Sequence, residues 1–392
     1  LMAGSVISKY WGVYLNDFMR LMGWNANTNL AFGSFHIDIA PIIIVAFFTT
    51  LLVFGTKIGA RVDGAMTVLK IAIVFFVVIV GFFYVKASNF TPFIPPSQPA
   101  STVEGSSAVT GVMTQPLWQF ATGMTPSVYG VPGILSGAAL VFFAFIGFDV
   151  VATASEETKN PHKNVPLGIG VGMLLIIVMY MLVAVVTTGM VSYADLAKQD
   201  SPSLATAFEL VGADWAAKII SFGIVLGLAT VVMVLLLGLT RIVFAMSRDG
   251  LLPRGLSKTG KHGTPAALQI VVGAVVALVA AFFDIGVLSD MVNIGTLSAF
   301  TLVAISIPIM RKKRPDLPRA FKMPGSPWIP ILIAVANFWL MLNLSVLTWI
   351  RFVVWLVVGV AIYFSYGYWH ARLGKGDLTE TLSAETDKAV NG

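Results

Sequence analysis

A single carboxylate interrupts a strongly apolar stretch between Gly137 and Asp149. Inside a bilayer, a charged side chain costs at least about 2.5 kcal/mol even on lenient insertion scales. We therefore expect Asp149 to face a polar cavity or a partner group, where it could act as a proton-sensitive switch. A structural hydrogen bond or ion pair is the alternative interpretation.

Gly147 lies two residues before this carboxylate and predicts a break in the helix. Where a helix unwinds, backbone carbonyls lose their intrahelical partners and become acceptors for an ammonium group. At membrane depth such backbone is tolerated only where it lines a cavity. The segment 143–149 is therefore a candidate site for the α-amino group of a substrate. The alternative is that Gly147 only allows close packing of helices.

Lys70 is a second charged residue inside an apolar run, separated from Arg61 by eight residues. A buried lysine loses its proton readily, so Lys70 could take part in proton transfer. Its long side chain could instead reach the nearby membrane surface, or form a structural ion pair.

Three further residues could shape or close such a site. Met233 lies in the middle of an apolar run, where it could narrow a pocket, although Met more often fills gaps in a core. Glu156 and Glu157 follow the predicted break, where ion pairs with Lys159 could close an inner gate. Solvated charges on a loop are the alternative.

The composition of the chain excludes a water-soluble protein. Of its 392 residues, 57% are apolar and 11% are charged, and the mean hydropathy is +0.86. A soluble fold could not cover this much apolar surface. The net charge of +6 (25 basic minus 19 acidic residues) is scattered between apolar runs and does not form the basic stripe typical of nucleic-acid binding.

Residues that commonly hold metals or perform covalent catalysis are sparse. The sequence has no Cys, and its four His residues are far apart, at positions 36, 162, 262 and 370. No metal-ligand spacing or nucleophile–base arrangement is present. We therefore expect no metal, no cofactor and no enzymatic activity.

Nine apolar runs are long enough to cross a bilayer, which takes about 20 helical residues. They lie at residues 38–55, 62–84, 133–154, 165–190, 215–245, 265–283, 286–309, 328–347 and 350–369. Connections rich in Lys and Arg alternate with three that have few, at 86–132, 191–214 and 284–290. Because basic loops stay in the cytoplasm, we expect an all-α, multi-pass protein of the cell membrane with a cytoplasmic C-terminus.

Three parts of the sequence resemble one transporter superfamily. They are the segment 142–166 (FFAFIGFDVVATASEETKNPHKNVP), the segment 241–253 (RIVFAMSRDGLLP), and DMVNIGTL at 290–297 followed by RPDLPR at 314–319. They resemble the amino acid, polyamine and organocation (APC) transporters, especially the cationic amino acid transporter branch. The similarity extends from about residue 38 to residue 370.

The resemblance implies a fold of twelve helices with two inverted repeats of five and a substrate site at the membrane midplane. It implies that the carbonyls of Phe143 and Ile146 hold the substrate amine, next to Ala144 and Gly147, with the Phe143 ring as a gate. It also implies that Lys70 occupies the place where sodium-coupled members bind a cation, so that proton coupling would replace sodium coupling.

By this resemblance the chain begins within the third family helix, and an incomplete first repeat is expected. Residues 1–15 would be the remnant of that helix, 16–132 the rest of the first repeat with an outer loop, 133–309 the second repeat, 310–370 the last two helices and 371–392 a cytoplasmic tail.

The main hypothesis is a secondary active amino acid permease that works by alternating access, through proton symport or exchange. The family branch suggests cationic amino acids, but Asp149 is the one obvious mid-membrane carboxylate in the sequence, so neutral amino acids stay open. The alternative is a truncated membrane subunit that binds a partner without transporting.

Overall fold

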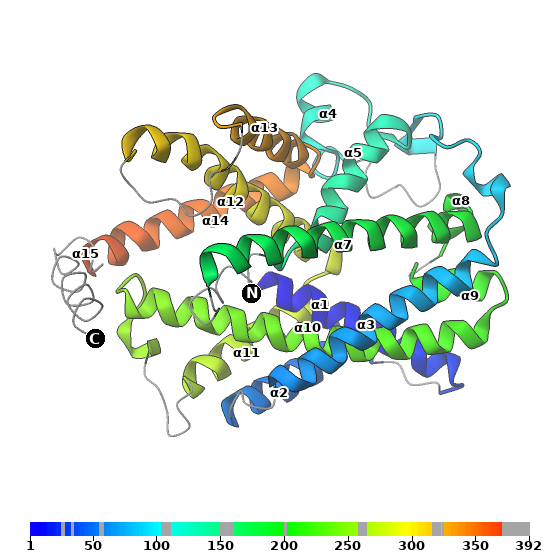
Figure 1. The fold of residues 1–392 in the computed structure, drawn as a ribbon, viewed down its shortest axis with the longest axis horizontal. Coiled ribbons are helices and arrows are strands. Elements are labelled where there is room, and N and C mark those ends of the chain that lie inside the picture. The colour runs from blue at the N-terminus through cyan, green and yellow to red at the C-terminus, as the bar shows by residue number, and fades with distance from the viewer. Residues whose placement is uncertain are drawn as a thin grey trace.

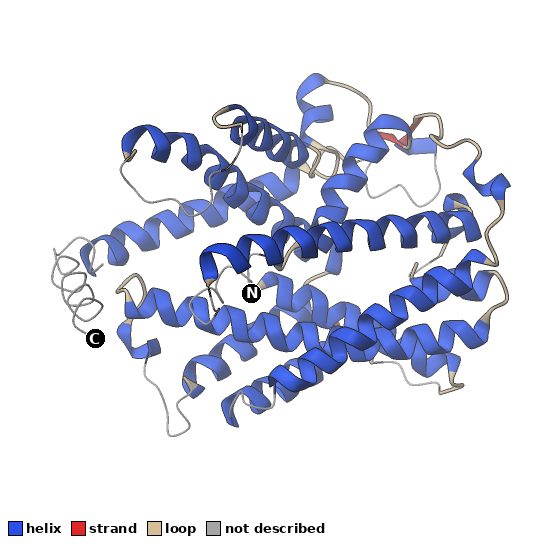
Figure 2. Ribbon diagram, viewed as in Figure 1, coloured by secondary structure: helices blue, strands red, loops and turns tan. Residues whose placement is uncertain are grey.

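The computed structural model describes residues 1–24, 28–32, 35–54, 59–102, 111–148, 158, 160–199, 202–257, 265–315, 323 and 325–370. Helices dominate these residues, and strands form two short antiparallel pairs (Figure 2). The all-α prediction is therefore confirmed. The predicted tail 371–392 lies outside the described residues.

Among the described residues, nine apolar helices occupy the positions of the nine expected runs. Five are long and apolar enough to cross a membrane, namely α3 (Gly59–Phe82), α7 (Pro161–Met190), α10 (Asp214–Arg248), α12 (Ile285–Lys313) and α14 (Val346–Ile362), which continues through a π turn (Tyr363–Gly367) into α15 (Tyr368–His370). Four are shorter, namely α2 (Ile39–Phe54), α5 (Gly130–Val141) with the 3₁₀ turn η4 (Phe142–Phe145), α11 (Ala266–Phe282) and α13 (Trp328–Leu342).

The remaining elements are the N-terminal helix and short connecting pieces. They are α1 (Met2–Leu21), β1 (Asn29–Phe32), β2 (Phe35–Asp38), η1 (Ala87–Phe90), β3 (Gln98–Pro99), η2 (Ala100–Thr102), α4 (Leu117–Thr122), β4 (Ser127–Val128), α8 (Tyr193–Ala197), α9 (Leu204–Leu210) and η6 (Arg254–Ser257). The helix α1 is longer than the expected remnant 1–15, and its last turn is tied to α9 by two hydrogen bonds from Arg20 to Glu209, at 2.9 and 2.8 Å.

Local capping explains a shifted boundary late in the chain. The runs expected at 328–347 and 350–369 are separated instead by Asn343–Ser345. The Asn343 amide donates to the Trp339 carbonyl (2.8 Å), and the Ser345 hydroxyl accepts from the backbone N–H of Thr348 (3.2 Å). Such an N-cap starts a new helix, so α14 begins four residues earlier than the hydropathy predicts.

One group of helices, α1, α2, α10 and α11, packs around a common apolar core in the lower part of Figure 1. Its buried residues include Ile44, Val232, Leu236 and Val276. Near the middle of α1, Lys9 forms an ion pair with Asp38 and donates to the Ala280 carbonyl (3.1 Å). Because a buried ion pair is costly to separate, these contacts link α1 firmly to α11 and to the end of β2, directly before α2.

A second group, α5, α12, α13 and α14, lies in the upper part of Figure 1. Its core includes Ala139 from α5, Ile294 and Leu297 from α12, and Met341 from α13. The indole N–H of Trp349 donates to the Met341 carbonyl (2.9 Å), which joins the start of α14 to the end of α13.

The helix α7 runs beside α3 and carries many exposed apolar side chains, among them Leu174, Met181 and Val185. A long apolar helix that packs this little surface against its own protein is typical of contact with lipid. At about 52 Å, the 35-residue α10 exceeds a bilayer core of about 30 Å, so it must tilt or project beyond it. Together these helices confirm a multi-pass membrane protein.

Candidate functional site

The regular helix α5 ends at the position that the sequence predicts. After Val141 the chain tightens into the 3₁₀ turn η4 (Phe142–Phe145), Ile146 is extended (φ −70°, ψ 135°), and Gly147 has φ +128°. A residue with a side chain rarely adopts such a positive φ, so glycine is required here. The predicted break at Gly147 is therefore confirmed, while Asp149 lies outside the described residues.

Polar groups from two other helices hold the backbone around this break. The Tyr180 hydroxyl from α7 donates to the Ala144 carbonyl (2.8 Å), and the buried Asn293 amide from α12 donates to the Leu140 carbonyl (3.3 Å). Within the turn, the Ile146 N–H donates to the Phe143 carbonyl (3.1 Å). The two side chains replace helix hydrogen bonds that the unwound backbone cannot make.

A cavity of about 310 Å³ lies between the break and α7. Its walls are apolar or aromatic apart from the backbone and the Tyr180 hydroxyl, and are formed by Ala144, Phe145, Ile146, Gly147, Phe148, Gly168, Ile169, Gly172, Met173, Ile176 and Tyr180. The rings of Phe145 and Tyr180 meet edge to face with centroids 5.2 Å apart. Gly168 and Gly172 have no neighbouring atom where a side chain would begin, so they keep the α7 wall open.

The break has a second, packed side. Phe143 and Ile146 contact the cluster formed by Val6 of α1 with Leu288 and Val292 of α12. The break therefore lies between the cavity beside α7 and the helices α1 and α12. Of the four substrate residues predicted here, Ala144, Ile146 and Gly147 border the cavity, whereas Phe143 packs on the opposite side.

Lys70 lies on α3 where it crosses α10. A Cβ atom added to Gly227 would be 3.2 Å from Lys70 Cγ, so the lysine stem packs closely against α10 at this position. The side chain is half-buried, and one turn further along α10 the Thr230 hydroxyl donates to the Gly227 carbonyl (2.9 Å). Lys70 is thus inside a helix–helix contact, away from the cavity at the break.

The other predicted site residues are separated from the cavity or not described. Met233 is buried in the core shared by α2, α10 and α11. It is not one of the residues that line the cavity at the break. Glu156 and Glu157 lie outside the described residues. Tyr180 and Asn293 are not among the residues predicted for the site, although each is a polar side chain inside an apolar run.

Comparison with known proteins identifies the family. The family described as amino acid permease matches residues 6–367, nearly the whole described chain. This chain belongs to the amino acid permease family. The match confirms the predicted APC transporter resemblance, and the permease is an amino acid transporter and not an enzyme.

The relatives of this permease are named for different substrates. The branched-chain amino acid permease BcaP of Bacillus subtilis is 39% identical over 96% of this chain and 75% of its own length. The methylthioribose transporter of the same organism is 36% identical over 96% of this chain and 75% of its own length. Cationic amino acid transporter 4, vacuolar, of Arabidopsis thaliana is 34% identical over 71% of this chain and 42% of its own length.

Proposed function

We propose that this permease is a secondary active transporter of neutral amino acids with branched apolar side chains. The observation that carries the proposal is the interrupted helix at Gly147, which puts non-helical backbone next to a cavity with apolar walls. A cavity of about 310 Å³ has room for a small amino acid, and its aromatic and aliphatic lining suits an apolar side chain.

Backbone groups at the break would bind the substrate amine. An ammonium group needs acceptors, and the carbonyls of Ala144 and Ile146 belong to the segment where helical bonding stops. Tyr180 would act by fixing the Ala144 carbonyl, and the Phe143 ring would cover the bound amine on the side of α1 and α12. Met233 would influence pocket size only indirectly, through the core behind it.

The branched-chain name of the Bacillus subtilis relative agrees with the apolar cavity. The cationic names of the Arabidopsis relatives favour a second candidate, a lysine or arginine substrate. A cationic side chain would need an acidic partner, and Asp149 is the predicted one. The two candidates are therefore separated by whether arginine competes with leucine.

For the energy source we propose proton coupling. Lys70 is half-buried where α3 packs against α10, and a lysine partly removed from water can release and regain a proton as its surroundings change. Asp149 would be the second titrating group, and Glu156 and Glu157 would form ion pairs that close the inner side. Alternating access would follow from motion of the group formed by α5, α12, α13 and α14 against the group formed by α1, α2, α10 and α11.

The distribution of basic loops supports a place in the cell membrane with a cytoplasmic C-terminus. In this orientation the carboxyl ends of α3 and α7 face outward. The division into repeats expected from the resemblance (16–132 and 133–309) remains part of this proposal.

Uptake by proteoliposomes tests substrate and coupling together. Labelled leucine should enter faster at acidic external pH, and unlabelled arginine should compete weakly. Asp149→Asn should remove the pH stimulation, whereas Asp249→Asn, a matched change at an exposed carboxylate after α10, should not. Strong competition by arginine would favour the cationic substrate, and pH-independent uptake by the parent protein would contradict proton coupling.

A further inference from the structure

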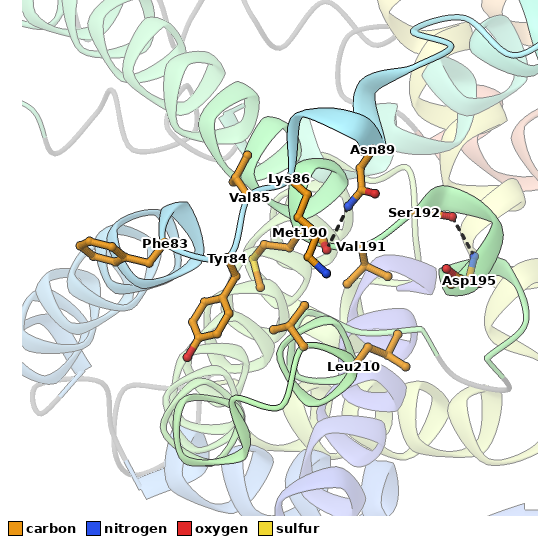
Figure 3. A pocket seen from close by; sticks show the side chains of 11 residues that line it. Phe83, Tyr84, Val85, Lys86, Asn89, Met190, Val191, Ser192, Asp195 and Leu210 are labelled. Carbon is orange, nitrogen blue, oxygen red and sulfur yellow. Dashed lines mark hydrogen bonds between the residues drawn. The ribbon is translucent and has the colours of Figure 1, made fainter.

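A second cavity, of about 510 Å³, lies where the carboxyl ends of α3 and α7 meet α9 (Figure 3), and it shares no lining residue with the cavity at the break. Its lining combines aromatic, aliphatic, cationic and anionic side chains: Phe83, Tyr84, Val85, Lys86, Asn89, Met190, Val191, Ser192, Asp195, Leu210 and Val211. None of the expected site residues contributes to it.

Hydrogen bonds to backbone carbonyls at the end of α7 fix the walls of this cavity. The Asn89 side chain donates to the carbonyls of Gly189 (2.8 Å) and Met190 (3.1 Å), and the Lys86 N–H donates to the Gly189 carbonyl (2.9 Å). A Cβ atom at Gly189 would lie 2.7 Å from Phe90 Cζ, so only glycine lets the connection approach α7 this closely. The cavity is therefore preformed.

Its floor is part of a well-buried apolar core. Met190 and Val191 belong both to the cavity lining and to the cluster around Phe208 and Ile220, which are fully buried. A floor of this kind cannot collapse easily into the cavity.

Opposite charges line the same cavity. The Lys86 side chain extends into it in Figure 3 and pairs with no acidic side chain of the described residues. Asp195 lies at another edge, and its contact with Lys198 is long (3.5 Å) and exposed, so it binds weakly. Ser192 also lines the cavity. Its hydroxyl caps α8 by accepting a hydrogen bond from the Asp195 N–H.

The cavity lies at the ends of two helices that are long and apolar enough to span a membrane, and the ends of such helices lie at the level of the lipid headgroups. It opens at the ends of α3 and α7, two membrane helices whose outer faces are largely uncovered. Phe82 and Phe83, both strongly exposed, stand at the end of α3 beside it. Aromatic side chains at helix ends are typical of the membrane–water interface.

We infer that this cavity binds the headgroup of a phospholipid with a primary ammonium, such as phosphatidylethanolamine. Lys86, with help from the Ser192 hydroxyl, binds the phosphate, and Asp195 accepts hydrogen bonds from the ammonium. The acyl chains lie along the uncovered faces of α3 and α7. The inference needs only that these helices span the membrane, and is independent of the transported substrate.

Native mass spectrometry of the full chain tests this inference. The protein is equilibrated with an equimolar mixture of phosphatidylethanolamine, phosphatidylcholine and phosphatidylglycerol, and the retained lipids are counted. We expect retention of phosphatidylethanolamine over phosphatidylcholine by about tenfold, because choline has no N–H to donate to Asp195. Equal retention of the two, or preference for phosphatidylglycerol, would overturn the inference.

Substitutions at Lys86 and Asp195 distinguish the roles of the two charges in lipid binding. Lys86→Met should lower retention of phosphatidylethanolamine and phosphatidylcholine alike, because both share the phosphate, and Lys86→Arg should restore it. Asp195→Asn should abolish only the preference for phosphatidylethanolamine. Lys198→Met, which removes a nearby charge that does not line the cavity, should change neither. If neither Lys86→Met nor Asp195→Asn changed lipid retention, the lipid would bind elsewhere and the proposed site would be refuted.

A free amino acid is the competing occupant of a cavity with both charges. If leucine displaced phosphatidylethanolamine from the parent protein, and Lys86→Met removed this effect, the cavity would be an amino acid site and the lipid inference would fail. Lipid retention is measured without substrate. A protein that retained the lipid but did not take up leucine would therefore contradict only the proposed function.

Discussion

Replacing Tyr180 with Phe removes the hydroxyl that α7 supplies to the unwound segment. In the native protein Tyr180 Oη donates to the Ala144 carbonyl over 2.8 Å, and the ring touches Phe145. The variant keeps the ring but leaves the carbonyl without this partner. Tyr180 is 40% exposed in a helix that can span the membrane, so its surroundings are lipid, where an unsatisfied polar group costs about 1–3 kcal/mol.

This energy should appear mainly as weaker substrate binding. If binding requires the segment in its present conformation, the energy needed to restore that conformation is subtracted from the binding free energy. A loss of about 1–2 kcal/mol raises the Kd by about 5- to 30-fold. Folding should be affected less, because the cores around Ile294 and Phe208 do not involve Tyr180.

Equilibrium binding of labelled leucine to purified protein measures the effect, with the Tm recorded for the same samples. Tyr363→Phe is the matched control, since it deletes an exposed hydroxyl in the π turn after α14. If Tyr180→Phe bound leucine as tightly as the parent protein, the Ala144 carbonyl would not depend on Tyr180 and the reasoning would be refuted.

Three further substitutions test other parts of the structure. Gly147→Val puts a β-branched residue at φ +128°, so leucine uptake should be lost even where protein survives purification; uptake at the parent rate would show that the break is not needed. Gly273→Val would place a Cβ atom 2.2 Å from Thr49 Oγ1 and should lower stability by about 1–3 kcal/mol, seen as a lower Tm that Thr49→Ala partly restores; an unchanged Tm would contradict the close contact. Lys70→Met should abolish stimulation of uptake by external acid but retain leucine exchange, and persistent stimulation in the uptake assay would remove Lys70 from the coupling step.

The sequence predicts the helices well because hydropathy over about 20 residues reports whether a segment can lie in lipid. It also predicts the break, because Gly147 is a local cause of a local conformation. The start of α14 differs from the prediction because Ser345 and Thr348 form a cap between two apolar runs, and a hydropathy average does not register a single cap.

The site is only partly predictable because its contacts join distant segments. Tyr180 and Ala144 are 36 residues apart, and their hydrogen bond depends on how α7 packs against η4. Met233 shows the same limit in reverse: its position in the run gives its depth in the membrane, but the face of α10 that it occupies is set by packing against α2 and α11. Similarly, Lys9 becomes buried only because Asp38 and the end of α11 surround it.

The central claim is that an amino acid binds at the break before Gly147, and the chain offers a direct test because it contains no Cys. A single cysteine introduced as Ala144→Cys, on the wall of the cavity, can be modified with a small thiol reagent in the presence and absence of leucine. The account predicts that saturating leucine slows this modification by about tenfold or more, while a control cysteine at the exposed Ser365 reacts at an unchanged rate. Modification of Ala144→Cys at the same rate with and without leucine, in protein shown to bind leucine, would contradict it.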